Sequence, residues 1–374
     1  MVVFMIEENK KLASKLVKYC CKLKKGEKVL IEASLVDDDF LVCLVNEVYS
    51  VGAFPFVSIT SPIVEKAIML GNTEQYCSLK ASYDRIRMED MDAYIGIRGK
   101  NNIFEFSDIP HKNLKNNAIY YVKPIHFDIR VNKKWVILNY PSPSLAQQAG
   151  VSTESFKELY YKVCTLNYRK MDKALDPLKS LMEKTDKVRI VAPGTDLTFS
   201  IKGMKAIKCS GECNIPDGEI YTAPLRTSVN GKITYNIPSV YENKRFDNVC
   251  FKIKDGKIIS AKANNNKIAI NKILDIDEGA RYFGEFSLGI NPYITKPMLD
   301  ILFDEKMCGS IHLTPGSCYD DAYNGNHSAI HWDLVQSHTE ENGGGEIYFD
   351  DVLIRKNGIF VLDELKGLNP ENLI

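Results

Sequence analysis

The sequence predicts two domains: an α/β N-terminal domain with a mostly parallel sheet, and an α+β, strand-rich C-terminal domain. Two domains are expected because 374 residues exceed the roughly 250 to 300 at which one hydrophobic core stops growing. The first half alternates short apolar runs with longer amphipathic segments, whereas the second half is rich in β-formers around Asn-Gly and Asp-Gly pairs. We set the domains at residues 1–185 and 186–374.

The N-terminal half has the β-α-β pattern that favours a parallel sheet covered by helices. Residues 38–53 have the pattern of an amphipathic helix, and the acidic residues Asp37 to Asp39 suit its positive end. The apolar runs predicted to be strands are residues 27–34, 54–59, 92–99, 118–124 and 135–141. Neither G-x-G-x-x-G nor G-x-x-x-x-G-K-[ST] occurs in this half, so the sequence offers no phosphate loop for a nucleotide.

A helical segment at residues 155–184 is predicted to lead from one domain to the next, with Pro177 kinking or restarting it. Beyond it, β-formers flank three dipeptides that favour tight hairpins. These dipeptides are Asn230-Gly231, Asp255-Gly256 and Asn357-Gly358. The strand-rich class of the C-terminal domain follows from them.

Composition excludes several classes of partner. Lysine plus arginine and aspartate plus glutamate both number 48, so the net charge predicts neither nucleic acid nor an anionic membrane as partner. No apolar run approaches the ~18 residues of a transmembrane helix. The start "MVVFMIEENKK" turns acidic before any signal cleavage site, and the ten cysteines include no C-x-x-C pair. We therefore expect free thiols and a reducing, cytoplasmic setting.

A histidine and an aspartate lie two residues apart in "SAIHWDLVQS", residues 328–337. If residues 328–335 form a strand, the apolar side chains share one face, and His331 and Asp333 lie together on the other. On a helix the two side chains would point apart, because positions two apart are not neighbours there. The strand interpretation puts an imidazole beside a carboxylate on a rigid platform.

Three other segments of this half have the same division of faces. Glu285 and Ser287 oppose the apolar positions of "GEFSLGI", and His312 opposes those of "SIHLT". Glu219 and Tyr221 oppose the apolar positions of "DGEIYTAP". Each segment taken alone fits an exposed polar face of an antiparallel strand.

If these groups converge, their charges favour a metal site. Three carboxylates and two neutral imidazoles carry a charge of minus three, which two divalent cations and one hydroxide would balance. The five side chains are Glu219, Glu285, His312, His331 and Asp333. Oxygen and nitrogen ligands without thiolate suit two ions of zinc, cobalt or manganese per subunit.

Four ordered blocks resemble the thermophilic aminopeptidases, the family of aminopeptidase T, aminopeptidase S and PepS-like enzymes. The blocks are "IPDGEIYTAP", "LDIDEGARYFGE", "LFDEKMCGSIHLTPGSCY" and "NGNHSAIHWD". The resemblance implies metal-dependent hydrolysis of N-terminal amino acids from peptides by a homodimer of two-domain subunits. It also implies co-catalytic metal ligands at the same five positions, Glu219, Glu285, His312, His331 and Asp333.

The resemblance also implies roles for individual residues. Tyr319 stands seven residues after His312, where the family has a functional tyrosine, and could donate a hydrogen bond to the developing oxyanion. Glu285 is the other candidate catalytic residue, and either Glu285 or Asp333 would be the carboxylate shared by the two ions. The stretch between His312 and His331 is shorter than in the family, so we expect the pocket to differ there.

Two other functions fit parts of the pattern. His331 and Asp333 form an H-x-D pair like that of non-haem iron oxygenases, but such a triad needs a second histidine, and only His338 follows. A non-catalytic metal-binding protein is the second alternative, although structural zinc sites favour cysteine-rich tetrahedra.

The remaining candidates are given plainer roles. We expect His327 in a loop beside the site and His338 at the surface. Asp304 and Glu305 are candidate acceptors for the N–H groups of the metal-binding histidines.

Overall fold

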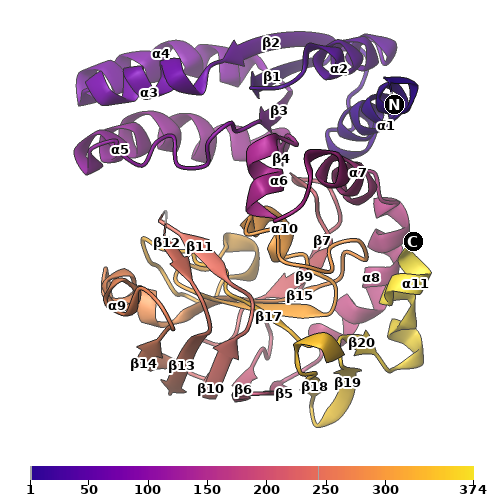
Figure 1. Ribbon diagram of the computed structural model, residues 1–374, viewed down its shortest axis with the longest axis vertical. Helices are drawn as coiled ribbons and strands as arrows, with labels where there is room; N and C mark the ends of the chain where they lie inside the picture. The colour runs from indigo at the N-terminus through magenta and orange to yellow at the C-terminus, as the bar shows by residue number, and fades with distance from the viewer. Residues whose placement is uncertain (1, 243) are drawn as a thin grey trace. The chain divides into compact units, whose positions relative to one another are not determined.

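The structure is a computed structural model that describes residues 2–242 and 244–374 (Figure 1). Its chain forms two compact units. The first extends to Thr165 and also takes in Gly211–Ile215, and the second consists of Leu166–Ser210 and Pro216–Ile374. In the predicted connecting segment, α7 (Thr153–Cys164) belongs to the first unit, α8 (Tyr168–Met182) to the second, and Pro177 lies inside α8.

A five-stranded parallel sheet forms the centre of the first unit, as predicted, with strand order β2-β1-β3-β4-β8. Its strands are β1 (Lys28–Ser34), β2 (Phe54–Thr60), β3 (Ala93–Arg98), β4 (Lys134–Asn139) and β8 (Asn214–Ile215). The helices of this unit besides α7 are α1 (Val2–Ser14), η1 (Lys15–Cys20), α2 (Asp38–Ser50), α3 (Pro62–Gly71), α4 (Glu74–Asp90), α5 (His111–Asn117), η2 (Ala118–Phe127), η3 (Arg130–Asn132) and α6 (Pro143–Gln148). The central strands β1 and β3 are nearly continuous apolar runs, as expected of strands buried on both faces.

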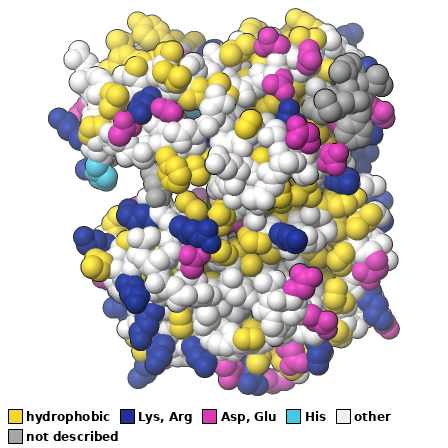
Figure 2. Space-filling model, viewed as in Figure 1, with side chains coloured by type: hydrophobic (Ala, Val, Ile, Leu, Met, Phe, Trp, Pro, Cys, Tyr) yellow, Lys and Arg dark blue, Asp and Glu magenta, His cyan; other side chains and the backbone are white. Residues whose placement is uncertain are grey.

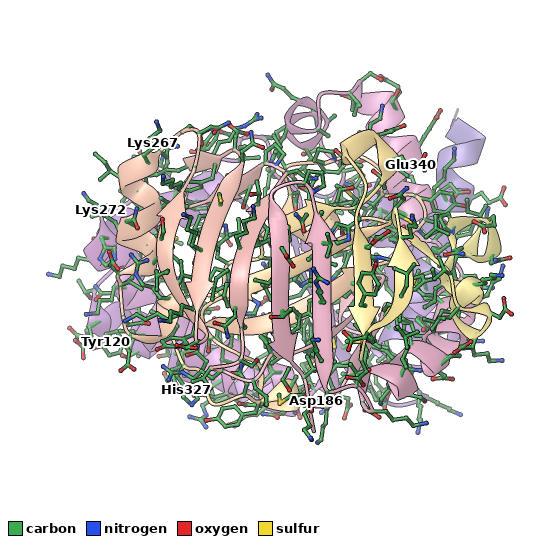
Figure 3. The ribbon with its side chains drawn as sticks, turned by 90° about the horizontal axis from the view of Figure 1, so that it is seen from below. Tyr120, Asp186, Lys267, Lys272, His327 and Glu340 are labelled. Atoms are coloured by element: carbon green, nitrogen blue, oxygen red, sulfur yellow. The ribbon has the colours of Figure 1, made fainter. Side chains whose placement is uncertain are left out.

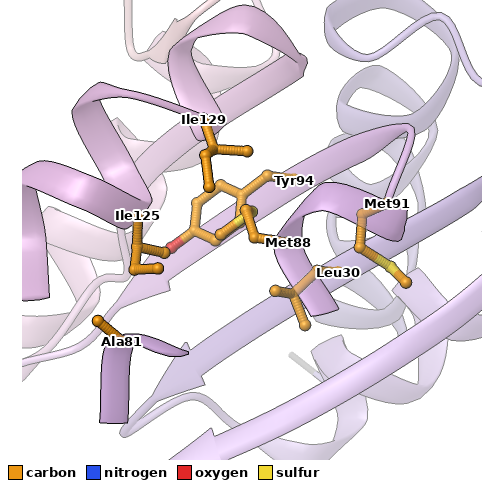
Figure 4. Packing of buried hydrophobic residues seen from close by; sticks show 7 residues of the cluster. All are labelled: Leu30, Ala81, Met88, Met91, Tyr94, Ile125 and Ile129. Atoms are coloured by element: carbon orange, nitrogen blue, oxygen red, sulfur yellow. The ribbon is translucent and has the colours of Figure 1, made fainter. Parts of the chain in front are cut away.

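The strand predicted at residues 118–124 is wrong, because these residues begin the helix η2. Tertiary packing outweighs their preference for strands. The Tyr121 hydroxyl donates to Asp84 of α4 at 2.9 Å, and the ammonium of Lys80 lies 3.3 Å from the centre of the Tyr121 ring. The core beside η2 is the cluster of Figure 4, formed by Leu30, Ala81, Met88, Met91, Tyr94, Ile125 and Ile129.

The second unit contains two antiparallel sheets, and the predicted strand-rich class is confirmed. The larger sheet has the order β14-β13-β10-β6-β5-β18-β19-β20, and Figure 3 shows its strands side by side. Its strands are β5 (Lys187–Ala192), β6 (Thr195–Ser200), β10 (Asn230–Tyr235), β13 (Val249–Lys254), β14 (Lys257–Lys262), β18 (Glu346–Phe349), β19 (Val352–Lys356) and β20 (Ile359–Phe360). The smaller sheet, with order β17-β16-β15-β9-β7, consists of β7 (Ile207–Cys209), β9 (Glu219–Thr222), β15 (Phe283–Gly289), β16 (Ser310–Pro315) and β17 (Val335–Ser337).

The two sheets of this unit pack on each other through aromatic side chains. The rings of Phe199 in β6 and Phe286 in β15 meet edge to face at 4.9 Å, and the Tyr235 hydroxyl donates to the carbonyl of Leu313 at 2.9 Å. The other elements are the hairpin β11 (Ser239–Tyr241) and β12 (Lys244–Phe246), and the helices α9 (Lys267–Leu274), η4 (Gly279–Arg281), α10 (Ile301–Asp304), η5 (Asp320–Ala322), η6 (Glu340–Asn342), η7 (Asp363–Leu368) and α11 (Pro370–Leu373). Among the described residues, no helix is both long and apolar enough to cross a bilayer.

Two of the three predicted hairpin turns are confirmed. Asp255-Gly256 joins β13 to β14 with φ of 50° and 81°, and Asn357-Gly358 joins β19 to β20 with φ of 49° and 82°. The turn predicted at Asn230-Gly231 is wrong, because both residues belong to β10. The glycine is needed there for a different reason: a Cβ on Gly231 would lie 2.1 Å from the carbonyl oxygen of Asp196 in the neighbouring strand.

Candidate metal centre

Three of the predicted ligands lie on adjacent strands of the smaller sheet. Ser287 of β15 pairs with His312 of β16, and Gly289 of β15 pairs with Glu219 of β9. Glu219, Glu285 and His312 therefore lie on three adjacent strands of the sheet. They are deeply buried, with exposed fractions of 4%, 3% and 1%. The polar face predicted by alternation is therefore an interior surface and not an exposed one.

The other two predicted ligands follow less regular backbone. The strand predicted over residues 328–335 is wrong, because only Val335 of these residues belongs to a strand, β17. His331 forms an isolated β-bridge with Gly316. The left-handed Gly316, with φ of 112°, lies so close to Ile330 that a Cβ would be 2.1 Å from its carbonyl oxygen. In place of a regular ladder, the amide of Ser317 donates to the carbonyl of Ile330 at 2.7 Å and that of Trp332 donates to the carbonyl of Pro315 at 3.1 Å.

The predicted alternation of side chains nevertheless holds in this segment. Trp332 is 1% exposed, and its ring packs against Tyr241 and Phe246 of the β11–β12 hairpin, each with a centroid distance of 4.9 Å. Burial of this indole on one side directs His331 and Asp333 to the other side. The structure therefore brings all five predicted residues together.

Glu285 lies at the centre of this group. One of its carboxylate oxygens is 2.9 Å from Nε2 of His312, and the other is 3.2 Å from Nε2 of His331. The same His331 nitrogen is 3.2 Å from Oδ1 of Asp333. Two sets of donor atoms result, each with its atoms within 4.8 Å of one another: Glu219, Glu285 and His312 form one set, and Glu285, His331 and Asp333 form the other.

Both imidazoles are oriented by main-chain carbonyl groups. Nδ1 of His312 lies 3.3 Å from the carbonyl oxygen of Glu305, and Nδ1 of His331 lies 2.8 Å from that of Ser317. Donation from each Nδ1 leaves Nε2 as the nitrogen that faces the carboxylate of Glu285. Glu305 thus has the acceptor role predicted for it, through its backbone and not through its carboxylate.

Hydroxyl groups fix two of the carboxylates. Thr314 donates to Oδ1 of Asp333 at 2.6 Å, and Ser287 donates to Oε2 of Glu219 at 2.9 Å. The buried Lys306 also contacts Glu219. Sequence reasoning missed Lys306, and the only signal for it was its place beside Glu305 in the block that contains His312.

The remaining predictions have mixed outcomes. His327 is exposed in a loop, as predicted, and shares a hydrogen bond with Tyr323 at 2.8 Å. The surface position predicted for His338 is wrong: it is 0% exposed and lies 3.0 Å from the amide oxygen of Gln336. Asp304 accepts from the backbone of Met298 at 2.6 Å, so the histidine partner predicted for it is replaced by a main-chain amide.

The carboxylates among the five candidate ligands favour positive charge close to them. Burial opposes ionisation of Glu285, but the hydrogen bond from His312 and the positive charges of His312 and His331 lower the pKa of its carboxyl group. Burial disfavours the charged form of His312, but Glu219 and Glu285 raise its pKa to about 10. Asp333 and Glu285 likewise outweigh burial and raise the pKa of His331.

The donor atoms fit a divalent cation. Nε2 of His331 is buried and has no hydrogen-bond partner of good geometry among the described residues, although carboxylate oxygens of Glu285 and Asp333 lie 3.2 Å away. A buried nitrogen in this arrangement suits a metal ligand better than a hydrogen-bond donor. Mixed carboxylate and imidazole donors are typical of zinc, cobalt and manganese sites.

Tyr319 lies beside His331 and is partly exposed to solvent. Its ring is 4.7 Å from that of His331 and 5.6 Å from that of Tyr221, and it is 49% exposed. Partial burial and the charges of Glu285 and Asp333 raise the pKa of its phenol, so the hydroxyl keeps its proton at neutral pH. It can therefore donate a hydrogen bond to a molecule that reaches the group from solvent.

Comparison with known proteins identifies the family. The model of the thermophilic metalloprotease family M29 matches residues 6–360. The chain belongs to this family. It is a metalloaminopeptidase of family M29, and a metalloprotease requires a divalent metal. The two sets of donor atoms around Glu285 offer positions for it.

Several curated aminopeptidases are similar to this M29 chain. Aminopeptidase PepS of Streptococcus thermophilus is 24% identical over 97% of this chain and 100% of its own. Aminopeptidase T of Thermus thermophilus is 23% identical over 84% and 86% of the two chains. The match to aminopeptidase AmpS of Bacillus subtilis, at 30% identity, spans only 34% of each protein.

Solved structures share the fold. Wild-type AmpT from Thermus thermophilus superimposes with a TM-score of 0.80 at 18% identity, over 95% of this chain and 99% of that one. A 2,5-dihydroxypyridine dioxygenase from Pseudomonas putida has a TM-score of 0.61 at 12% identity, over 95% and 98%. Because an aminopeptidase and a dioxygenase share this architecture, the fold alone does not decide which reaction is catalysed. The oxygenase alternative is weakened by His338, which lies outside both sets of donor atoms.

Proposed function

We propose that this M29 chain hydrolyses the N-terminal peptide bond of peptides at a binuclear metal centre. The proposed ligands are Glu219, Glu285, His312, His331 and Asp333. The observation that carries the proposal is the position of Glu285, whose two carboxylate oxygens face two different imidazoles at 2.9 and 3.2 Å. A carboxylate that belongs to two sets of donor atoms could serve as a ligand to two neighbouring ions. We therefore favour Glu285 over Asp333 as the shared ligand.

The donor set also indicates which ions are bound. Three carboxylates and two neutral imidazoles leave a charge of minus three, which two divalent cations and one hydroxide balance. We propose zinc, cobalt or manganese. Because all five residues belong to the second unit, we propose it as the metal-binding catalytic domain.

Divalent ions, when bound, would supply Lewis acidity and lower the pKa of bound water to about 7. The side chains of this protein supply orientation and proton positions. The carbonyl groups of Glu305 and Ser317 hold the Nδ1 protons of His312 and His331, so that both Nε2 atoms face the site. Tyr319 keeps its proton and donates a hydrogen bond to the oxyanion that develops on the scissile carbonyl. Glu285 and Tyr319 are thus the catalytic residues that we propose.

The proposed substrate is a peptide with a free N-terminus, because one ion, when bound, would offer a ligand position to the free amine. The test uses metal-free protein that is supplied with cobalt, zinc or manganese, with aminoacyl-nitroanilides and peptides as substrates. We expect metal-dependent cleavage of peptides with a free amine and no cleavage of the same peptides after N-acetylation. Metal-loaded protein that leaves free-amine peptides intact contradicts the proposal. Oxygen consumption with ferrous iron and 2-oxoglutarate would favour the oxygenase instead.

We also propose that the chain forms a homodimer through the first unit. The edge strand β2 and the helix α3 expose large apolar side chains, among them Ile59 at 69% and Ile63 at 73%, and α3 buries none of its residues. Figure 2 shows hydrophobic side chains gathered on this unit. An exposed apolar face of this kind is typical of a protein–protein interface, and a second copy would cover it. None of the ten cysteines, all of which the structure describes, forms a disulfide, and this supports the reducing, cytoplasmic setting that we propose.

A further inference from the structure

A buried lysine lies behind the candidate ligand Glu219. Lys306 follows α10 and precedes β16, and it is only 2% exposed. Its ammonium group contacts three carboxylates: that of Glu219, that of Glu305 at 2.7 Å and that of Asp217 at 3.7 Å. Lysine is almost never fully buried unless it is paired, so these contacts account for its position.

The two carboxylate oxygens of Glu219 contact different partners. Oε1 contacts Lys306, whereas Oε2 accepts a hydrogen bond from Ser287 at 2.9 Å and lies 3.5 Å from Nδ1 of His312. The carboxylate is therefore held from both sides. Because Glu305 also holds His312 through its carbonyl oxygen, the pair Glu305-Lys306 supports two candidate ligands at once.

The same ammonium lies beside a third set of donor atoms. Cys209, Asp217 and Glu219 have possible ligand atoms within 4.8 Å of one another. Two of these three residues already contact the ammonium of Lys306. The ammonium group of Lys306 thus lies beside three donor atoms that would otherwise favour binding of a metal ion.

We propose that Lys306 is a positioning residue of the metal centre and acts as a fixed internal cation. It holds Glu219 in the orientation needed by the set that contains His312, and it keeps metal ions away from Cys209. This inference rests on the proposed binuclear function. Loss of a residue that orients a ligand commonly lowers metal affinity by about 10-fold to 100-fold.

The experiment titrates metal-free protein with Co²⁺ and follows binding by calorimetry and by absorption. Wild-type protein is expected to bind two equivalents without a near-ultraviolet thiolate-to-cobalt band. Lys306→Met keeps most of the length of the side chain but removes its charge, so one equivalent should bind at least about tenfold more weakly. A thiolate band should appear as Cys209 becomes available to the ion. Lys306→Arg, which keeps the charge, should bind cobalt more tightly than Lys306→Met and show no such band.

The control is Lys134→Met, which removes another paired lysine, located 2.6 Å from Glu27 in the first unit. Its cobalt binding should equal that of wild type. Circular dichroism and thermal melting check that each variant folds. If Lys306→Met does not fold, Lys306→Gln replaces it, because it keeps a polar end without the charge, and the same changes are expected.

The outcomes separate this inference from the proposed function. Wild-type protein that binds fewer than two equivalents, or does not cleave peptides, refutes the binuclear peptidase. Wild-type protein that binds two equivalents, together with folded Lys306→Met of unchanged affinity, refutes only the positioning role of Lys306. Weakened binding without a thiolate band refutes the exclusion of metal from Cys209.

Discussion

Nε2 of His312 lies 2.9 Å from a carboxylate oxygen of Glu285, although 27 residues separate them along the chain. The contact arises because the two residues lie on neighbouring antiparallel strands, β15 and β16. Both side chains point to the same face of the smaller sheet, away from the aromatic packing of Phe286 against the larger sheet. A rigid sheet therefore sets the spacing at the centre of the candidate metal site.

Replacing Glu285 with glutamine should abolish most activity. The amide keeps the shape of the side chain, but it removes one negative charge and offers only one oxygen to the two imidazoles that it faces. We expect kcat to fall by about 100-fold or more and metal content to drop below that of wild type. Nitroanilide kinetics and metal analysis measure both. Glu346→Gln, at a partly exposed ion pair with Lys356, is the control, and a fully active Glu285→Gln would remove Glu285 from the mechanism.

Replacing Tyr319 with phenylalanine should lower kcat about 100-fold, as loss of one oxyanion donor does in other hydrolases. KM and metal content should stay near wild type, because the ring still packs against His331. Tyr323→Phe is a matched control, since Tyr323 is 51% exposed in the same loop and its hydroxyl contacts His327. Equal rates for the two variants would argue against the role of Tyr319.

Stability should depend on pH through His338. Burial and the charge of Arg355 lower its pKa well below the ordinary value of about 6.5, so the folded protein keeps it neutral. Below pH 6.5 the unfolded chain takes up a proton that the folded chain does not, so this residue lowers stability by about 1.4 kcal/mol for each pH unit. Urea unfolding at a series of pH values from about 7.5 down to about 5 measures this effect. The free energy of unfolding should fall less steeply with decreasing pH in His338→Gln than in wild type. His327→Gln, at an exposed site, is the control variant.

A charge on the exposed apolar face of the first unit should dissociate the dimer. Ile63 is 73% exposed, so Ile63→Glu should leave the folded subunit stable while placing a carboxylate in the interface. Light scattering after gel filtration should report a monomer. Ile268→Glu provides a matched control, because Ile268 is 75% exposed on α9 of the second unit. A wild-type chain that is already monomeric would rule out this interface.

Alternation along short segments was enough to place the five candidate ligands on polar faces. Period-two patterning is a local property, so Glu285, His312 and the pair His331 and Asp333 could be assigned to polar faces without knowledge of the fold. The burial of that polar face could not be predicted in this way, because it depends on what covers the sheet. Lys306 was missed for a related reason: its contact with Glu219 joins residues 87 positions apart.

Local signals failed where another chain segment decides the conformation. Asn230-Gly231 has the sequence of a tight turn, but the close approach of Asp196 in the neighbouring strand requires the glycine within β10. Residues 118–124 have β-forming side chains, yet packing of Tyr121 against α4 favours the helix η2. Both errors are cases of tertiary contacts outweighing local preference.

The short strand β8 makes the two units inseparable as genetic modules. Because Gly211–Ile215 belongs to the first unit while the residues on either side belong to the second, isolating the second unit requires cuts after Thr165, Ser210 and Ile215. The last of these cuts falls four residues before Glu219. A second unit transplanted onto another protein would therefore lose a backbone segment that ends close to Glu219, the first of the proposed metal ligands, so a simple exchange of the two units would disturb the candidate site.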